Sequence, residues 1–320
     1  MIQKKTIIRT TDGADFASAK SGLNEIGFIN FIKKNAVLGK DVILGIGDDA
    51  AVVRTKGKFL VCTTDIIIQG VHFKKGDNLR KIGRKALAVN ISDIAAMGAL
   101  PKYALISAGI PRGYTLSQAK EIFIGINNLA RKFGISVIGG DTSASEILVI
   151  NAAVIGEADK DKLVRRSTAK PGDFICLTGT LSCFPGMRHF DFTPRVYEAG
   201  YLVKNYPITS MIDISDGLVI DLYRICETSK CGAVLFTEFI PRAKKMSLTD
   251  ALYNSGESFE LLFTVSEKYA GQLKENFFRR FKTKFSIIGK ICPRHMGIKL
   301  LDKNGKLTPA EIKGYLHFKR

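Results

Sequence analysis

A polar segment that ends in Pro-Gly, residues 156–173, divides the sequence into two parts of comparable length. Both parts alternate runs rich in Val, Ile and Leu with segments whose apolar residues recur every three or four positions. The first pattern is typical of strands and the second of helices with one buried face. Because the alternation restarts after the polar segment, we expect an α/β chain of two domains rather than one doubly wound sheet.

The predicted elements follow from these patterns and from turn signals. Strands are predicted at 41–53, 58–68, 103–110, 135–138, 147–155, 174–178, 210–214, 259–265 and 286–291. Helices are predicted at 79–97, 115–133, 194–205, 218–229 and 268–281, with Thr115 or Ser117 as a cap and Gly134 as a stop. The predicted organisation is an extension (1–22), an N-terminal domain (23–156) and a C-terminal domain (157–320).

Composition excludes several classes of protein. Of the 320 residues, 46% are hydrophobic and 24% are charged, which is the balance of a globular chain. Six cysteines without a CxxC pair and four histidines without HExxH give no zinc or thiol redox motif. The longest apolar run, 147–156, is shorter than the ~20 residues of a membrane span. The N-terminus has no apolar signal core, so we expect a soluble, cytoplasmic protein.

The net charge of +18 is concentrated near the C-terminus, where residues 268–320 hold 14 lysines and arginines and three acids. Such a balance suits an anionic partner, either a nucleic acid or a phosphorylated small molecule. A solvated basic surface explains it equally well. Since no nucleic-acid motif accompanies the charge, a nucleic-acid partner is not predicted.

Aspartates recur in five short segments flanked by Gly, Ser or Thr at the ends of predicted elements. The segments are GIGDDAAV (45–52), TTD (63–65), NISDIAAMGALP (90–101), GGDTS (139–143) and DISDGL (213–218). Any one of them is an ordinary turn or cap. If they converge, like charges about 4 Å apart repel by about 4 kcal/mol per pair at an effective dielectric near 20. Protons or cations must then neutralise the cluster.

Hard divalent cations are the natural partners of such a cluster, and Mg²⁺ commonly links carboxylates to nucleotide phosphates. The hydroxyls of Thr63 and Thr64 would add oxygen ligands, and Gly139 and Gly140 would let backbone approach a phosphate. Arg166 could clamp a phosphate or be an exposed linker arginine. The sequence has neither a P-loop nor the HRD and DFG motifs of protein kinases.

The order of these motifs resembles that of the thiamine-phosphate kinase family. The series is GIGDDAAV, TTD followed by GVHF, AVNISDIAAMGALP, IGGDT, RRSTAKPGD, DISDGL and SGESFELLFTV, and the resemblance runs from about Glu25 to GYLHF near the C-terminus. It implies a PurM-like fold, with an N-terminal ATP- and Mg²⁺-binding domain that dimerises and a C-terminal α/β domain. It also implies ATP-dependent phosphorylation of thiamine phosphate to thiamine diphosphate, by direct in-line transfer with Mg²⁺ and with ATP as co-substrate.

The resemblance further assigns roles to residues of this chain. Asp93, Asp141 and Asp216 would be catalytic, Gly140, Arg166 and Ser215 would contact ATP, and His72, Glu257 and Tyr315 would face thiamine phosphate. The implied metal ligands are Asp49, Thr63, Thr64, Asp65, Asp93, Asp141, Asp213 and Asp216.

The chain departs from the family pattern at two places. Ser258 stands where the family usually has an aspartate after Glu257, and the segment 181–193 is shorter than usual, without the expected helix. Two alternatives therefore stay open: an enzyme of the same superfamily with another acceptor, and a non-catalytic ATP-binding paralogue.

Overall fold

The computed structural model describes residues 25–182 and 188–317, so the predicted extension 1–22 lies outside the described residues. Residues 36–315 form one compact unit. Helix α1 (Glu25–Asn35) belongs to a second unit with the residues after Tyr315, where the backbone N–H of His317 donates to the Glu25 carboxylate at 2.9 Å. No helix among the described residues is long and apolar enough to cross a membrane.

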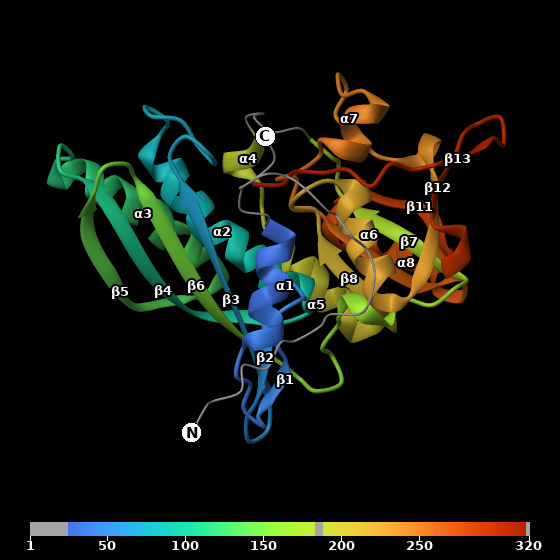
Figure 1. The fold of residues 1–320 in the computed structure, drawn as a ribbon, viewed down its shortest axis with the longest axis horizontal. Helices are drawn as coiled ribbons and strands as arrows, with labels where there is room; N and C mark the ends of the chain where they lie inside the picture. Colours follow the sequence, from blue (N-terminus) through green and yellow to red (C-terminus); the bar gives the residue numbers. More distant parts are fainter. Residues whose placement is uncertain (1–24, 183–187, 318–320) are drawn as a thin grey trace, which may run out of the picture. The chain divides into compact units, whose positions relative to one another are not determined.

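The first sheet of the 36–315 unit has six strands in the order β1-β2-β3-β6-β4-β5 (Figure 1). The strands are β1 (Val42–Leu44), β2 (Ala51–Arg54), β3 (Phe59–Ile68), β4 (Leu100–Pro111), β5 (Ser136–Ser145) and β6 (Val149–Ala158). All neighbours are antiparallel except β4 and β5. Alternate residues of β6 are buried, which is the pattern of a sheet covered more fully on one face than on the other.

Two long helices, α2 (Leu79–Ala96) and α3 (Leu116–Phe133), supply the cover on the buried face. The Asn78 side chain caps α2 by accepting the N–H of Lys81. Thr115 and Gln118 form a capping box at the start of α3, and Gly134 ends it in a left-handed conformation at φ 67°. The predicted cap at Thr115 and stop at Gly134 are confirmed.

The second sheet has seven strands in the order β13-β12-β9-β11-β7-β10-β8. Its strands are β7 (Asp173–Thr178), β8 (Ile208–Asp213), β9 (Cys231–Phe236), β10 (Leu261–Ser266), β11 (Phe285–Pro293), β12 (Ile298–Leu301) and β13 (Leu307–Pro309). The helices that accompany it are α4 (Arg188–Asp191), α5 (Val196–Asn205), α6 (Leu218–Ser229), α7 (Leu248–Tyr253) and α8 (Glu267–Phe281), with 3-10 turns η1 (Arg166–Thr168), η2 (Thr237–Phe239) and η3 (Arg294–Met296). Helices α5 and α8 share a core with one face, and α6 and α7 share a core with the other.

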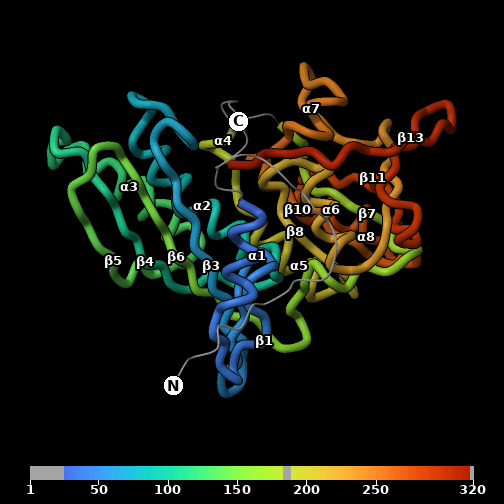
Figure 2. Tube along the Cα trace, viewed as in Figure 1, coloured from blue at the N-terminus to red at the C-terminus, as the bar shows by residue number. Residues whose placement is uncertain are grey.

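Helix α2 contacts both sheets. It packs on β3, β4 and β6 of the first sheet and also contacts β8 and α5 of the second (Figure 2). Thirteen of its 18 residues are buried, and several of these are alanines that permit close packing. The core of the first sheet consequently continues into residues of the second, such as Met211 and Phe263.

Several predicted boundaries were wrong. The predicted strand 41–53 is two strands, β1 and β2, separated by the Gly-Asp turn. The GGDTS segment lies inside β5 rather than after it, because this edge strand is ten residues long and polar residues are tolerated on its exposed face. Strands β9, β12 and β13 and helix α7 were not predicted, and the 181–193 segment retains the four-residue helix α4.

Replacement of Gly125 by Ala should destabilise the fold. A Cβ atom there would lie 1.9 Å from the Arg80 carbonyl oxygen of α2, so the two helices would have to separate. Overpacking of this kind typically costs about 1–3 kcal/mol. Gly271→Ala is the control, since that helical glycine in α8 has nothing within 4 Å of the added Cβ and the change should stabilise by up to about 1 kcal/mol. Urea unfolding midpoints measure both effects, and equal midpoints for the two variants would contradict the packing argument.

Candidate metal and phosphate site

Three aspartates from separate elements meet at one point. Asp49 lies in the turn before β2, Asp93 on α2 and Asp213 at the end of β8. One carboxylate oxygen of each lies within 4.8 Å of those of the other two. Because α2 lies against both sheets, it can bring its own carboxylate between one from each. The structure therefore brings three of the predicted metal ligands together.

Burial and mutual repulsion both disfavour charge on this cluster. Asp213 is 1% exposed, and its pKa is raised by burial and then by the Asp49 charge. The pKa of Asp93 is raised well above its usual value by burial and by neighbouring carboxylates, of which Asp65 is the foremost. The folded protein thus keeps protons that the unfolded chain releases above pH 3.8. The stability of the metal-free protein should therefore fall as pH rises from 3.8 toward the raised pKa values.

Two hydroxyl groups orient these carboxylates. The Thr63 hydroxyl donates to Asp93 Oδ2 at 2.8 Å, and the Ser92 hydroxyl donates to Asp213 Oδ2. Ser92 precedes Asp93 on α2, so this helix contributes one aspartate of the cluster and holds a second one, Asp213, by a hydrogen bond. Ser92 was not predicted, although its place in the NISD motif beside Asp93 is the signal that could have identified it.

Arg166 is the cation that balances the cluster. Its guanidinium donates to both oxygens of Asp49, with Nε 3.1 Å from Oδ2 and Nη2 2.5 Å from Oδ1. Its backbone N–H donates to Asp48 Oδ2 at 3.2 Å. Burial and the Asp49 charge raise the pKa of Asp48 to about 6, which Arg166 opposes. The side chain of Arg166 is only 15% exposed, so the alternative of an exposed linker arginine was wrong.

The loop between β8 and α6 is built around Asp221. The Asp221 carboxylate accepts the backbone N–H groups of Ser215, Asp216 and Gly217, each at 3.1 Å. Burial raises its pKa to about 7. The carboxylate of Asp216 pairs with Arg224 at 2.5 Å, so this predicted ligand lies outside the three-aspartate cluster. Asp221 was not predicted, although an acidic residue in the first turn of a helix commonly binds free N–H groups.

The side chains of TTD in β3 divide between the two faces of the sheet, because successive strand residues point in opposite directions. Thr63 lies toward α2, where it reaches Asp93, and the backbone N–H of Asp65 donates to Asn90 of α2 at 2.8 Å. The Thr64 hydroxyl contacts the amide of Asn151 on β6. The structure therefore does not bring Thr64 to the cluster.

Asp141 and Gly140 lie on β5, at the edge of the first sheet and separated from β3 by β6 and β4. Asp141 is exposed. A Cβ on Gly140 would lie 1.7 Å from the carbonyl oxygen of Ile106 on β4, so the sheet itself requires a glycine there. Within one chain, the structure brings neither residue to the three aspartates.

The predicted substrate-facing residues occupy three neighbouring places. His72 Nδ1 accepts the N–H of Ile68 at 3.1 Å. The carboxylate of Glu257 pairs with Lys85 of α2 at 2.5 Å. The N–H of Tyr315 donates to the Asp216 carbonyl at 3.0 Å, which attaches the C-terminal segment to the loop after β8. Lys85 was not predicted, although its spacing from Ile82, Val89 and Ser92 places it on the buried face of α2.

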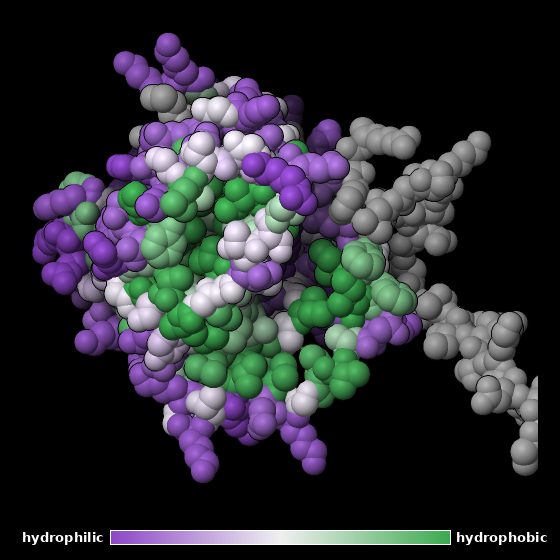
Figure 3. Space-filling view, turned by 90° about the vertical axis from the view of Figure 1, so that its left-hand side faces the viewer, coloured by the Kyte–Doolittle hydropathy of each residue, from purple (hydrophilic) through white to green (hydrophobic). Residues whose placement is uncertain are grey.

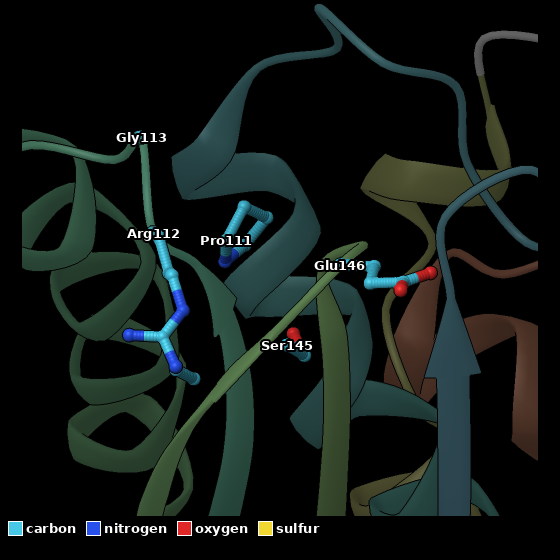
Figure 4. Close-up of a pocket in the computed structure, with 6 residues that line it drawn as sticks. Pro111, Arg112, Gly113, Ser145 and Glu146 are labelled. Carbon is cyan, nitrogen blue, oxygen red and sulfur yellow. The ribbon is translucent and has the colours of Figure 1, made fainter.

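An open hollow of about 560 Å³ lies apart from these residues, at the ends of β4 and β5. It is lined by Pro111, Arg112, Gly113, Ala144, Ser145 and Glu146. The side chains of Arg112 and Glu146 point away from each other (Figure 4). Because binding sites present convergent polar groups, this hollow is not the candidate site.

Comparison with known proteins identifies the family. Models of the N-terminal and C-terminal domains of AIR synthase related proteins match residues 47–158 and 187–300. The thiamine-monophosphate kinase of Bacillus subtilis is 33% identical over 328 residues, covering 93% of this chain and 100% of that protein. The chain belongs to the thiamine-monophosphate kinase family. The member from Buchnera aphidicola subsp. Acyrthosiphon pisum is 32% identical over 315 residues, covering 90% of this chain and 96% of that one.

The fold agrees with that family. The solved structure of AaThiL complexed with AMPPCP and TMP aligns with a TM-score of 0.79 and 29% sequence identity, covering 95% of this chain and 100% of that one. The predicted PurM-like α/β fold with two sheets is thereby confirmed. The boundaries predicted at 22/23 and 156/157 stay predictions.

Replacement of Asp93 by Asn should test whether the cluster binds metal. Asn preserves the volume and could serve as a cap, but it removes a charge. If Asp93 holds a metal ion that offsets the charge of a transferring phosphate, turnover should fall by about 10²–10³-fold, or ~3–4 kcal/mol. The unfolding midpoint without ligands should stay equal or rise, since one repelling carboxylate is gone. Turnover and melting curves measured with and without Mg²⁺ give both quantities.

The control is Asp302→Asn, a half-buried residue before a turn, whose carboxylate accepts the N–H groups of Asn304 and Lys306. It should leave turnover and the Mg²⁺-induced rise in melting temperature unchanged, whereas Asp93→Asn should reduce that rise. Near-normal turnover of Asp93→Asn would refute the metal role, and a large loss of ligand-free stability would show a structural role instead.

Proposed function

We propose that this chain phosphorylates thiamine phosphate to thiamine diphosphate with ATP as the donor. The observation that carries the proposal is the cluster of Asp49, Asp93 and Asp213, in which carboxylates from the first sheet, helix α2 and the second sheet lie within 4.8 Å of one another. Relatives that are at least 30% identical over most of this chain are thiamine-monophosphate kinases. A structurally similar relative was solved with AMPPCP and TMP.

The residues present fit Mg²⁺. Three carboxylates this close together, of which Asp93 and Asp213 have raised pKa values, need a cation when they are ionised, and oxygen ligands suit a hard divalent ion. Asp49, Asp93 and Asp213 would hold it, with Asp65 and Thr63 beside them. When bound, Mg²⁺ supplies positive charge that offsets the charge of the phosphates.

The donor phosphates have two sets of protein contacts available beside the cluster. Arg166 is a rigid bidentate donor, and its carboxylate partner Asp49 is itself a ligand candidate. With Asp49 engaged by a cation, the Arg166 guanidinium would be free to donate to a phosphate oxygen. The loop containing Ser215 is fixed by Asp221, so its backbone is already ordered before a nucleotide binds.

The acceptor needs little activation. Its nucleophile is a phosphate oxygen that is already deprotonated near neutral pH, so direct in-line transfer requires no strong general base. Positioning and charge neutralisation are then the main tasks of the protein. His72, Glu257 and Tyr315 are the proposed acceptor contacts.

The serine at position 258, where the family usually has an aspartate, is compatible with a catalytic site. Its hydroxyl lies 2.6 Å from the Ser255 carbonyl oxygen and 3.0 Å from that of Ser182, to either of which it can donate, and its Oγ accepts the N–H of Ser182 at 3.0 Å. Ser258 therefore secures the loop of Glu257 by neutral hydrogen bonds, where the family usually has an aspartate. This favours the kinase over the non-catalytic paralogue, because the loop stays anchored and the aspartate cluster is retained.

Thiamine phosphate should be turned over with ATP and Mg²⁺, and free thiamine should not. Free thiamine presents a hydroxyl group, which would need a general base, whereas the phosphate acceptor does not. Direct detection of thiamine diphosphate and thiamine phosphate by chromatography measures both reactions. Comparable turnover of free thiamine would refute the assignment, and activity only with another phosphorylated acceptor would favour the alternative enzyme of the superfamily.

We also propose a two-fold symmetric homodimer through the first sheet. The face of this sheet opposite α2 and α3 exposes Ile66, Tyr103, Leu105 and Ile138, each between 40% and 56% accessible. Figure 3 shows apolar side chains gathered on this side of the molecule. An apolar sheet face of this kind is typical of an interface, and two-fold dimers are the commonest closed assembly. Asp141 opposes Ser107, which opposes Asn151, on neighbouring strands, so a second copy would also cover Asp141.

Replacement of Leu105 by Glu should therefore separate the dimer, because it places a charge in the centre of the apolar face. Light scattering at about 10 µM should give twice 35.1 kDa for the wild type and 35.1 kDa for the variant. Phe239→Glu, at an exposed position beside the second sheet, should remain dimeric. Circular dichroism would establish that both variants are folded, and a monomeric wild type would contradict the proposal.

A further inference from the structure

Lys85 is a completely buried cation in the middle of α2, with 0% of its side chain exposed. An ammonium group has three donors, and three acceptors surround this one. Nζ lies 2.5 Å from Glu257 Oε1, 2.9 Å from the His72 carbonyl oxygen and 3.0 Å from His189 Nδ1. Burial lowers the pKa of Lys85, and the Glu257 carboxylate opposes that shift. Such a group is retained in a core only when its partners are well placed.

The partners of Lys85 include two of the three proposed acceptor contacts, His72 and Glu257. His72 follows β3, and Glu257 precedes β10, so these residues come from opposite sheets. Lys85 holds the backbone of one and the carboxylate of the other. Removal of the ammonium would leave the two segments without this shared attachment.

Glu257 also has a backbone conformation that needs support. Its φ is 57° and that of Phe259 is 48°, in the left-handed region that side-chain-bearing residues seldom adopt. The N–H of Glu257 donates to the Ser215 carbonyl at 2.8 Å, which places this turn on the loop that follows Asp213. The ion pair between Glu257 and Lys85 therefore helps to fix the position of the whole turn that contains Glu257 and Phe259.

Residues 189–192 brace the same turn from the other side. The Phe190 carbonyl oxygen accepts from Arg84 of α2 at 2.6 Å, and the Phe192 ring stacks on that of Phe259 with 4.1 Å between centroids. His189 Nδ1 lies 3.4 Å from Glu257 Oε2. His189 thus contacts both members of the buried pair.

Lys85 and Asp93 are on one helix, eight residues and hence about 12 Å apart along its axis. A rigid element of this kind sets the distance between the acceptor turn and the aspartate cluster. In-line transfer depends on such spacing, because a displacement of about 1 Å can cost on the order of 10²-fold in rate.

We infer that Lys85, with His189, is a positioning residue for the phosphoryl acceptor, which holds Glu257 and the His72 turn at a fixed distance from Asp93. The inference rests on the proposed function. It concerns the acceptor only, since none of the contacts of Lys85 described above involves Arg166, Ser215 or the aspartate cluster.

The test is steady-state kinetics of Lys85→Met, which keeps an unbranched side chain and removes the charge. The KM for thiamine phosphate should rise at least about 10-fold, while the KM for ATP stays within about twofold. Lys120→Met is the control. It is the same change at an exposed residue of α3, and it should alter neither constant.

A double variant distinguishes positioning from general stability. If Lys85 acts through Glu257, Lys85→Met combined with Glu257→Gln should have nearly the same acceptor KM as Glu257→Gln alone. Should Lys85→Met fail to fold, His189→Leu replaces it and should raise the acceptor KM selectively. Equal rises for both substrates, or an unchanged acceptor KM in a folded variant, would overturn the inference. A wild-type protein that does not use thiamine phosphate would overturn the proposed function, and this inference with it.

Discussion

Repulsion among buried carboxylates is the constraint on which the rest of this structure depends. Asp49, Asp93 and Asp213 lie close enough to share a cation, and burial makes their charges costly. The surrounding groups reduce that cost. The Arg166 guanidinium pairs with the Asp49 carboxylate, and the hydroxyls of Thr63 and Ser92 donate to Asp93 and Asp213. The site is thus prepared for positive charge, although the chain as a whole has a net charge of +18.

Helix α2 converts this local arrangement into a site with two ends. Its later turns carry Ser92 and Asp93 at the aspartate cluster, and Lys85 lies two turns earlier beside Glu257, a proposed acceptor contact. The helix can do so because its small buried residues let both sheets approach it. Fixed distances within one rigid element are a direct way to pre-organise two substrates.

The sequence predicted the family and most elements better than it predicted which of the candidate site residues lie together. Hydrophobic periodicity and caps predicted α2, α3 and most central strands, and the motif order predicted the family. Strand alternation separates Thr64 from Thr63, but which of the two lies toward α2 depends on tertiary packing. The edge position of β5 separates Asp141 from the cluster, and it depends on sheet pairing that local patterns do not contain. Lys85 and Asp221 were missed although helical spacing and a first-turn position pointed to them, because tertiary packing is what shows how completely each is buried.

The central claim is that the three aspartates form a metal site, and anomalous scattering tests it most directly. Crystals grown with Mn²⁺ and AMPPCP should show an anomalous difference peak at about 2.1 Å from carboxylate oxygens of Asp49, Asp93 and Asp213. In the same crystals Arg166 should have turned from Asp49 toward a phosphate. An occupied nucleotide site without a metal peak at these carboxylates, or with a peak only at other acids, would contradict the account.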